Sequence, residues 1–279
     1  MIDEASISDE EIMSINRAIL LRYGIDFTNY EINSLKRRIV RIINKYRFEN
    51  TIGLWKHLLK DSQFIFTYID EITVGLTEMF RNPDLWIKFR DDILPKLSCN
   101  STIYMWHAGC STGEEVYTAS IVLHEQNLRY CTYTLASDIN RTFVAKAQSG
   151  CYEADLLQQY QKNYLTFNPN SKKGIFEYFD SLKNSEFCVK AFVRQNISFV
   201  QHSLLEPLAD SQGRFDVIFC RNVLIYFDDT LKLKVLQLFY QTLHPDGFLI
   251  LGYFDSLSFG LYQPYFEMVE PAYKILRRK

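Results

Sequence analysis

Through the first 70 or so residues, apolar side chains recur every three or four positions, a spacing that predicts amphipathic helices. The segment 30–47, "YEINSLKRRIVRIINKYR", shows this spacing most clearly. Its apolar positions are Ile32, Leu35, Ile39, Ile42, Ile43 and Tyr46. Its other face is basic, with Lys36, Arg37, Arg38, Arg41, Lys45 and Arg47. Such a face is either solvated or a docking surface for an acidic partner. With a further short helix over 51–61, we expect a helical N-terminal domain spanning residues 1–76.

Beyond about residue 100 the pattern changes to short apolar runs that alternate with helical periods. Runs typical of buried strands occupy 102–108, 133–138, 197–201, 215–220 and 248–252. Helical patterns lie between them at 114–127, 140–150 and 229–243. This alternation predicts an α/β domain over 77–279 with a doubly wound, mostly parallel, Rossmann-like sheet. We interpret "HPDG" (244–247) as a stop and turn, and 265–278 as a closing hairpin.

The alternation fails over about 155–196. Within this stretch, "GIFEYFDSLKNSEFCVKAFVRQ" (174–195) has the pattern of short antiparallel strands. We interpret it as an inserted β-subdomain, which offers a second place for a partner to bind. The alternative is a loop elaboration without a role of its own.

Composition narrows the classes of function. The chain has 279 residues, 47% of them hydrophobic, and a formal net charge of −2, which gives no reason to expect nucleic-acid binding. It has no apolar run of membrane-spanning length, and its acidic start lacks the features of a signal peptide. The six cysteines are scattered, with no CxxC pair. We therefore expect no bound metal, no disulfide framework and a reducing cytoplasmic location.

Candidate chemistry begins with the loop "AGCSTG" (108–113), which leaves the first predicted strand and opens a helix. Gly109 and Gly113 permit close approach of the backbone to a ligand. Glu114 and Glu115 follow at the helix N-terminus, where they suit the helix dipole but would repel a pyrophosphate. They would suit a cation, or hydroxyl and amine donors. Asp138 ends the second strand, where a carboxylate accepts hydrogen bonds from ribose hydroxyls or caps the next helix.

An acidic ribose binder beside a loop unfriendly to phosphate favours S-adenosylmethionine over NAD. That ligand has a ribose, an adenine and a sulfonium, but no phosphate. A further strand ends in "FCRNVLIYFDD" (219–229), which places Arg221 and Asn222 at the same edge of the sheet. Arg221 could instead pair at the surface with Asp228 or Asp229, and Tyr226 could be a core tyrosine.

Several segments together resemble the successive motifs of the CheR-type chemotaxis receptor methyltransferases, in matching order and spacing. They are "GLTEMFRNPDLW", "WHAGCSTGEEVYTASIVLHE", "LASDINRTFVAKAQSGCY", "FDVIFCRNVLIYFDD" and "LHPDGFLILG". The resemblance covers nearly the whole chain, including the helical part and the β-insert. It implies a protein-glutamate O-methyltransferase that uses S-adenosylmethionine, leaves S-adenosylhomocysteine, and acts on the cytoplasmic signalling helices of chemoreceptors.

The resemblance also implies roles for particular residues. Arg81 and Tyr226 would lie nearest the transferred methyl as catalytic residues. The cofactor would be bound by Thr77, Arg81, Gly109, Glu114, Glu115, Asp138, Ser203, Leu204, Asn222 and Val223. Receptor helices would dock on the basic helix through Arg37, Arg38 and Arg41. The β-insert could add a strand from a receptor tail peptide.

Three positions depart from the family pattern. The family usually has asparagine at the position of Gly75, and asparagine or aspartate at that of Ser203. It commonly has a "GHSES"-like run where this chain has "GYFDSL" (252–257). Each departure changes a polar contact worth roughly 0.5–1.5 kcal/mol. They motivate the alternative function of a cofactor sensor or scaffold with little transferase activity. A small-molecule methyltransferase explains neither the basic helix nor the β-insert well.

Overall fold

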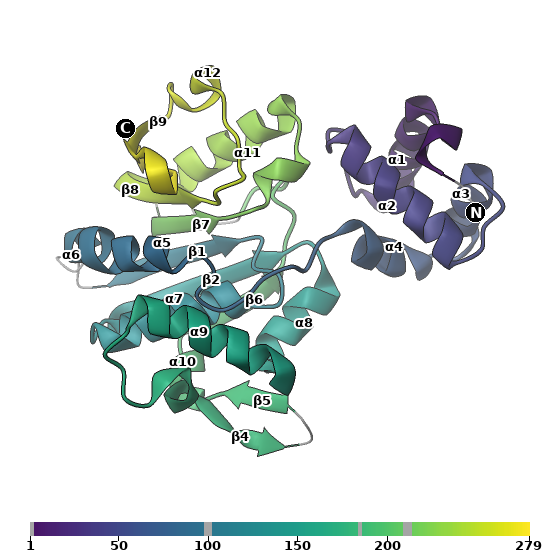
Figure 1. The fold of residues 1–279 in the computed structure, drawn as a ribbon. Helices are drawn as coiled ribbons and strands as arrows, with labels where there is room; N and C mark the ends of the chain where they lie inside the picture. Colours follow the sequence, from purple (N-terminus) through teal and green to yellow (C-terminus); the bar gives the residue numbers. More distant parts are fainter. Residues whose placement is uncertain (1–2, 98–101, 184–185, 209–213) are drawn as a thin grey trace.

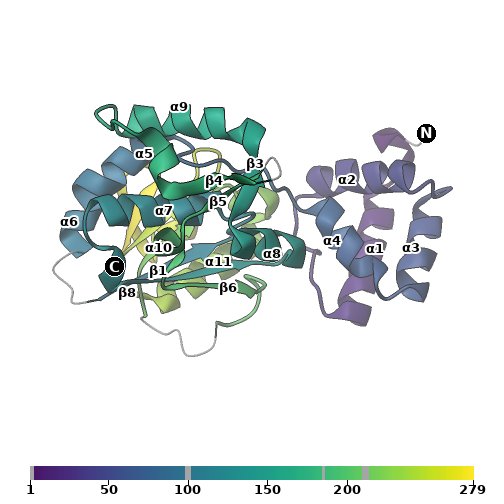
Figure 2. The same cartoon turned by 90° about the horizontal axis from the view of Figure 1, so that it is seen from below.

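The computed structural model describes residues 3–97, 102–183, 186–208 and 214–279. A helical domain lies at one end of a larger α/β domain in both views of the chain (Figures 1 and 2). The helical domain is formed by the short turn η1 (Glu4–Ser6) and by α1 (Asp9–Tyr23), α2 (Ile32–Lys45), α3 (Thr51–Lys60) and α4 (Phe64–Ile72). The predicted helices of this region are confirmed.

Local sequence explains where these helices begin and end. The Ser8 side chain accepts a hydrogen bond from the Glu11 amide while Glu11 bonds back to Ser8, which forms a capping box at the start of α1. Gly24, with a positive φ, ends the same helix. The apolar stripe predicted for α2 is buried in the domain core, together with apolar side chains of the other three helices.

The large sheet has seven strands in the order β6-β2-β1-β7-β8-β10-β9. Their bounds are β1 (Ile103–Ala108), β2 (Thr132–Asp138), β6 (Ile197–Gln201), β7 (Phe215–Cys220), β8 (Leu243–Leu251), β9 (Phe266–Glu270) and β10 (Ile275–Arg278). The first five in spatial order are parallel. The last two form the predicted antiparallel hairpin. The mostly parallel, doubly wound fold is therefore confirmed.

Alternate residues of each strand point to opposite faces of this sheet, and both faces are buried. On β7, Val217 and Phe219 pack in one core, and Ile218 and Cys220 pack in another. The first core includes α5 (Pro83–Lys88), the π-helical turn η2 (Phe89–Ile93), α6 (Leu94–Leu97) and α7 (Glu114–Glu125). The second core includes α11 (Asp229–Thr242). The helix α8 (Arg141–Ser149) contacts β2 and β6.

Strand β8 begins earlier than the sequence predicts. It takes in "HPDG", which we interpreted as a turn outside the strand, and its pairing with β7 is irregular there. Asp246 has a positive φ, and a Cβ on Gly247 would lie 2.9 Å from a backbone oxygen. The irregular stretch therefore lies inside the strand, while α11 ends at the predicted place.

The region between β2 and β6 contains a small antiparallel sheet in the order β3-β5-β4. Its strands are β3 (Cys151–Glu153), β4 (Phe179–Lys183) and β5 (Glu186–Val189). The prediction of antiparallel strands is confirmed, although β3 precedes the predicted insert. The insert also carries α9 (Leu157–Phe167), α10 (Ala191–Arg194) and the turns η4 (Ala154–Leu156) and η5 (Gly174–Tyr178).

The expectation of no disulfide is wrong at one position. Cys151 and Cys188 are direct partners across β3 and β5, and their sulfurs form a disulfide. The two cysteines are 37 residues apart in sequence, so their pairing could be recognised only after the strand register was known.

The helical and α/β domains are joined by direct hydrogen bonds. The amide of Glu31 donates to the carbonyl of Tyr226 at 2.8 Å, and the amide of Asp228 donates to the carbonyl of Asn29 at 2.9 Å. Tyr30 and Phe227, which lie between these bonds, form an antiparallel bridge and pack edge to face. The segment before α2 is therefore held against the loop that follows β7.

Candidate functional site

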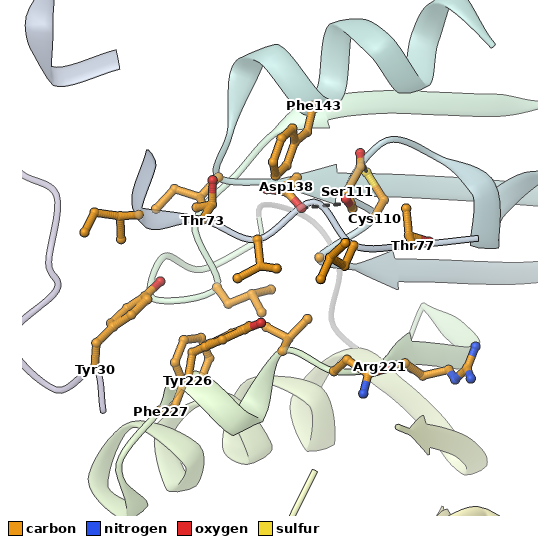
Figure 3. Close-up of a pocket in the computed structure, with 18 of the residues that line it drawn as sticks. Tyr30, Thr73, Thr77, Cys110, Ser111, Asp138, Phe143, Arg221, Tyr226 and Phe227 are labelled. Atoms are coloured by element: carbon orange, nitrogen blue, oxygen red, sulfur yellow. Dashed lines mark hydrogen bonds between the residues drawn. The ribbon is translucent and has the colours of Figure 1, made fainter. Parts of the chain in front are cut away.

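One pocket lies between α2 and the carboxyl ends of β1, β2 and β7. Figure 3 shows Tyr226 and Phe227 on one side of the pocket and Asp138 and Ser111 on the other, with Tyr30 of the helical domain at its margin. Strands β1, β2 and β7 are neighbours in the sheet, so their following loops meet at this edge. This is the position where doubly wound sheets bind ligands.

The pocket brings together all the predicted site residues except Glu114. Its lining includes Thr77, Arg81, Gly109, Glu115, Asp138, Ser203, Leu204, Asn222, Val223 and Tyr226. These residues come from separate parts of the chain, so their convergence is a property of the fold.

The loop after β1 approaches the pocket closely because of its backbone conformation. Gly109 has a φ of 87°, and a Cβ there would lie 2.5 Å from a methyl group of Val223. Ser111 also has a positive φ, which is uncommon for a residue with a side chain. The Ser111 hydroxyl oxygen is buried and has no hydrogen-bond partner among the described residues. It is therefore available to a polar group of a ligand.

Asp138 is held by the same loop. Its carboxylate accepts hydrogen bonds from the amides of Ser111 and Asn140, each at 2.9 Å. Burial raises the pKa of Asp138, although these amide bonds oppose the shift. Helix α8 is capped by the Asn140 side chain, so Asp138 is not the N-cap that the sequence left open. Each carboxylate oxygen has two lone pairs and retains capacity for a ribose hydroxyl.

The two glutamates at the start of α7 have different environments. Glu115 accepts a hydrogen bond from Nη1 of Arg221 at 3.0 Å, and Nδ1 of His107 lies 2.9 Å from its other oxygen. Burial alone would raise the pKa of Glu115, but the bond from His107 and the charge of Arg221 outweigh it, so the pKa is lowered. Arg221 is buried, so the expected alternative of a surface pair with Asp228 or Asp229 is wrong.

Glu114 is directed away from the pocket, into the interface with the insert. It accepts hydrogen bonds from Thr112 at 2.7 Å and from Tyr160 of α9 at 3.1 Å. Burial raises its pKa. The hydroxyl of Tyr152 on β3 also donates to the Thr112 carbonyl at 2.9 Å. Glu114 therefore supports the glycine loop from behind, so only one glutamate of the pair lines the site.

Arg81 is positioned by a constrained segment. Its neighbours Phe80 and Asn82 both have positive φ values. The Phe80 amide donates to Thr118 at 2.9 Å, and Arg221 donates to the carbonyl of Arg81 at 3.3 Å and to the side chain of Asn82 at 2.7 Å. Such strained backbone is found preferentially at functional sites.

Arg38 reaches the same region from the helical domain. Its guanidinium lies 5.8 Å from the centre of the Tyr226 ring, and its side chain lines the pocket. Burial raises the pKa of Tyr226, against the opposing charges of Arg38 and Arg81. Neither arginine forms an ion pair with a residue that the structure describes. Two cationic side chains therefore act on Tyr226, and neither is paired with a carboxylate among the described residues.

The rest of the predicted basic face is partly neutralised within the domain. Lys36 pairs with Asp9 at 3.1 Å, and Lys45 pairs with Glu71. Arg41 also lies near Glu71, at 3.6 Å, but its side chain is 66% exposed. Arg37 is exposed. The basic helix is therefore less uniform than its sequence predicts.

Two of the departures from the family pattern have local explanations. A Cβ on Gly75 would lie 2.8 Å from the ring of Phe143, which lines the pocket. The ring therefore occupies the space that a side chain at position 75 would need. The Ser203 hydroxyl accepts a hydrogen bond from the Leu205 amide at 3.3 Å, which stabilises its own turn.

The third departure, "GYFDSL", supplies a buried anchor. The carboxylate of Asp255 accepts hydrogen bonds from the amides of Asn222 at 2.6 Å, Ile225 at 3.1 Å and Gly252 at 2.7 Å. Burial raises its pKa, against these bonds. Asp255 thus fixes the loop that carries Asn222 and Tyr226.

Several residues that line the pocket were not predicted to do so from the sequence. For one of them, Arg38, the sequence contains an indication. Arg38 is three residues after Leu35 and four before Ile42, so it lies beside the apolar stripe. Tyr30 and Phe143 reach the pocket only through domain docking and the packing of α8, which no local pattern reveals.

The residues present fit S-adenosylmethionine. Asp138 retains acceptor capacity for a ribose, and the buried Ser111 hydroxyl is free to bond a polar group. The loop offers a close backbone approach at Gly109, and the carboxylates of Asp138 and Glu115 beside this loop disfavour a phosphate there. The doubly wound sheet and this site define the class of S-adenosylmethionine-dependent methyltransferases.

The particular family follows from sequence comparison. Residues 10–73 match the model of the CheR methyltransferase all-alpha domain, and residues 75–274 match that of the CheR methyltransferase SAM-binding domain. The chain belongs to the CheR methyltransferase family, and its cofactor is S-adenosylmethionine. No helix in the described parts of the chain is long and apolar enough to cross a membrane.

Curated relatives extend over nearly the same length. A putative methyltransferase Cher3 from Pseudomonas putida is 33% identical over 271 residues, which are 97% of each chain. A chemotaxis protein methyltransferase from Borreliella burgdorferi is 27% identical and covers 90% of each chain. One from Listeria innocua is 28% identical, over 88% of this chain and 89% of its own.

Proposed function

We propose that this chain methylates glutamate side chains on the cytoplasmic signalling helices of chemoreceptors and forms glutamate methyl esters in chemotaxis. Relatives named as chemotaxis protein methyltransferases support the pathway. The observation that carries the proposal is that Arg38 and Arg81 both line the pocket near Tyr226 without an ion pair among the described residues, although Nη1 of Arg81 donates to the Leu76 carbonyl at 3.1 Å. Arg38 and Arg81 offer a site for one carboxylate at the wall of the cofactor pocket.

A carboxylate acceptor requires little further chemistry from the protein. A glutamate side chain has a reference pKa of about 4.3, so it is ionised at neutral pH and needs no general base. Arginine binds carboxylates through paired hydrogen bonds, which would fix the direction of attack. The main tasks of the site are then to align the acceptor and to exclude water.

Bound S-adenosylmethionine supplies a methyl group on a positively charged sulfur, and transfer forms a C–O bond while the C–S bond breaks and leaves a neutral thioether. Arg81 and Arg38 would hold the acceptor carboxylate. Tyr226, which also lines the pocket, would position that carboxylate against the methyl group. No proton moves in this transfer, so none of these residues needs to act as an acid or a base.

The remaining site residues would hold the cofactor. Asp138 would accept hydrogen bonds from the ribose, and Ser203 and Leu204 would flank the adenine. Gly109 and Glu115 would lie against the methionine part. Thr77, Asn222 and Val223 would complete the wall. Glu114 is assigned a supporting role, because its contacts are to Thr112 and Tyr160.

The receptor would be bound in the cytoplasm by surfaces outside the pocket. The exposed side chains of Arg37 and Arg41 suit acidic helices, and the strand β4 at the edge of the small sheet could pair with a receptor tail peptide. The Phe143 ring fills the space of a side chain at Gly75, and Asp255 bonds the backbone that carries Asn222, so neither departure favours a sensor with little activity.

Labelled S-adenosylmethionine tests this function with receptor signalling domains from the source organism. We expect a label on glutamate that is released as methanol in mild base. The matched variant Arg81→Ala should transfer at least tenfold more slowly even at a saturating concentration of the cofactor. Failure of the wild-type chain to form a base-labile ester on any receptor would overturn the proposal.

A further inference from the structure

An exposed aromatic turn follows β8 at the edge of the sheet that carries the pocket. Tyr253 is 38% exposed and Phe254 is 72% exposed, although large apolar side chains are costly to leave in water. The two residues lie within a tight turn, in which the Asp255 amide donates to the Gly252 carbonyl at 3.0 Å.

The turn is rigid because both of its ends are fixed. Asp255 is 1% exposed and bonds three backbone amides, as described above. The ammonium of Lys274 also donates to the Asp255 carbonyl at 2.5 Å. At the other end, a Cβ on Gly252 would lie 2.7 Å from the Asn222 amide nitrogen, so the two backbones are in contact.

These contacts place the turn at the rim of the pocket. Asn222, which both Asp255 and Gly252 touch, lines the pocket. The Tyr253 ring lies 6.4 Å from that of Tyr273, and its pKa is raised by burial, by Tyr273 and by Asp84, against the charge of Arg221. Tyr253 is therefore near the same buried arginine that supports the floor of the site.

We propose that the Tyr253–Phe254 turn is a docking element for the protein that presents the acceptor carboxylate, and that it contacts an apolar side chain of that protein. The inference rests on the proposed function. A glutamate side chain is short, so an acceptor that reaches Arg81 must lay its backbone against the rim. Aromatic side chains on a fixed backbone bind with little loss of entropy, and they are enriched at the centres of interfaces. The turn thus recognises the apolar residues beside the acceptor glutamate, while the exposed arginines of α2 recognise its acidic ones.

Steady-state methylation of a receptor signalling domain tests the docking element. The double variant Tyr253→His with Phe254→Ser introduces the polar residues of the family run and keeps Asp255. We expect its KM for the receptor to rise at least tenfold, with kcat and cofactor affinity within twofold of the wild type. Tyr130→Ser is the matched control. Tyr130 is 69% exposed and precedes β2, so it lies at the amino ends of the parallel strands, away from the pocket at their carboxyl ends. Its KM should not change.

An unchanged KM in the double variant, with normal cofactor binding, would overturn the docking element and leave the methyltransferase function intact. A wild-type chain that methylates no receptor would overturn both. If the double variant loses cofactor affinity, Phe254→Ser alone decides, because that ring is mostly exposed and its removal leaves the turn intact. The conservative Phe254→Tyr should retain the wild-type KM.

Discussion

Nη1 of the buried Arg221 lies 3.0 Å from Oε2 of Glu115, whose side chain is 16% exposed, and this pair connects three segments around the pocket. Glu115 begins α7, Arg221 follows β7, and the same guanidinium donates to Asn82 beside Arg81. Removing one member of a buried pair leaves an uncompensated charge, which costs about 3–5 kcal/mol.

Glu115→Gln is therefore expected to lower the free energy of unfolding by about 3 kcal/mol at pH 7. The lowered pKa of Glu115 means that its charge stabilises the fold above the unfolded pKa of about 4.5. This contribution is lost as the pH falls through the lower folded value. Urea unfolding between pH 3 and 7 should show the difference between variant and wild type shrinking towards acid. A difference that stays constant over that range would contradict the prediction.

Glu114→Gln should have the opposite effect on the free energy of unfolding and on its pH dependence. Burial raises the pKa of Glu114 above 4.5, so its stabilising contribution is present in acid and is lost as the pH rises through the folded value. Glutamine can keep the bonds to Thr112 and Tyr160 without a buried charge. We expect the variant to be at least as stable as the wild type at pH 7, with cofactor affinity within twofold. Calorimetric titration with S-adenosylhomocysteine measures this, and a tenfold loss would show that Glu114 contacts the ligand.

Gly75→Asn, which introduces the usual family residue, should weaken cofactor binding rather than improve it. A side chain there meets the Phe143 ring, and overpacking typically costs about 1–3 kcal/mol. Combining it with Phe143→Ala should restore much of the affinity, because the ring is then absent. Calorimetric titration of the cofactor into both variants, and into Phe143→Ala alone, measures how the two substitutions are coupled. If their effects on cofactor affinity are additive, the predicted clash between position 75 and the Phe143 ring is excluded.

Arg38→Leu should reduce kcat/KM for the receptor by about ten- to a hundredfold, since a hydrogen bond to a charged group contributes about 1.5–3 kcal/mol. Arg37→Glu is the matched comparison on the exposed face of the same helix. It should raise KM in a manner that disappears at high salt, because exposed charges are screened. Cofactor affinity should be unchanged in both. Equal salt sensitivity of the two variants would place Arg38 on the docking face instead.

The disulfide gives a prediction for stability. Closing a loop of this length is expected to contribute about 2–4 kcal/mol to the free energy of unfolding. The double variant Cys151→Ser with Cys188→Ser should lose that amount in oxidising buffer and match the reduced wild-type chain. Mass spectrometry after alkylation without reductant should leave these two cysteines unmodified. Their full alkylation in the native, unreduced protein would contradict the pairing.

The sequence was most informative where periodicity or motif order determines structure. The parallel strands, the flanking helices and the pocket-lining set from Thr77 to Tyr226 follow from apolar runs and from the family resemblance. The directions in which individual side chains point could not be predicted from the sequence. Glu114 and Glu115 are adjacent, yet one faces the insert and the other the site. Their directions depend on Tyr160 and Arg221, which are distant in sequence, so no local pattern contains that information.

The bridge between Tyr30 and Phe227 has a thermodynamic consequence. The pocket has walls from both domains, so a ligand that fills it binds only the arrangement in which the domains are docked. Any such ligand shifts the population towards that arrangement by mass action, in proportion to its concentration over its dissociation constant. The helical domain, with α2, is therefore held against the α/β domain more firmly when the pocket is filled than when it is empty.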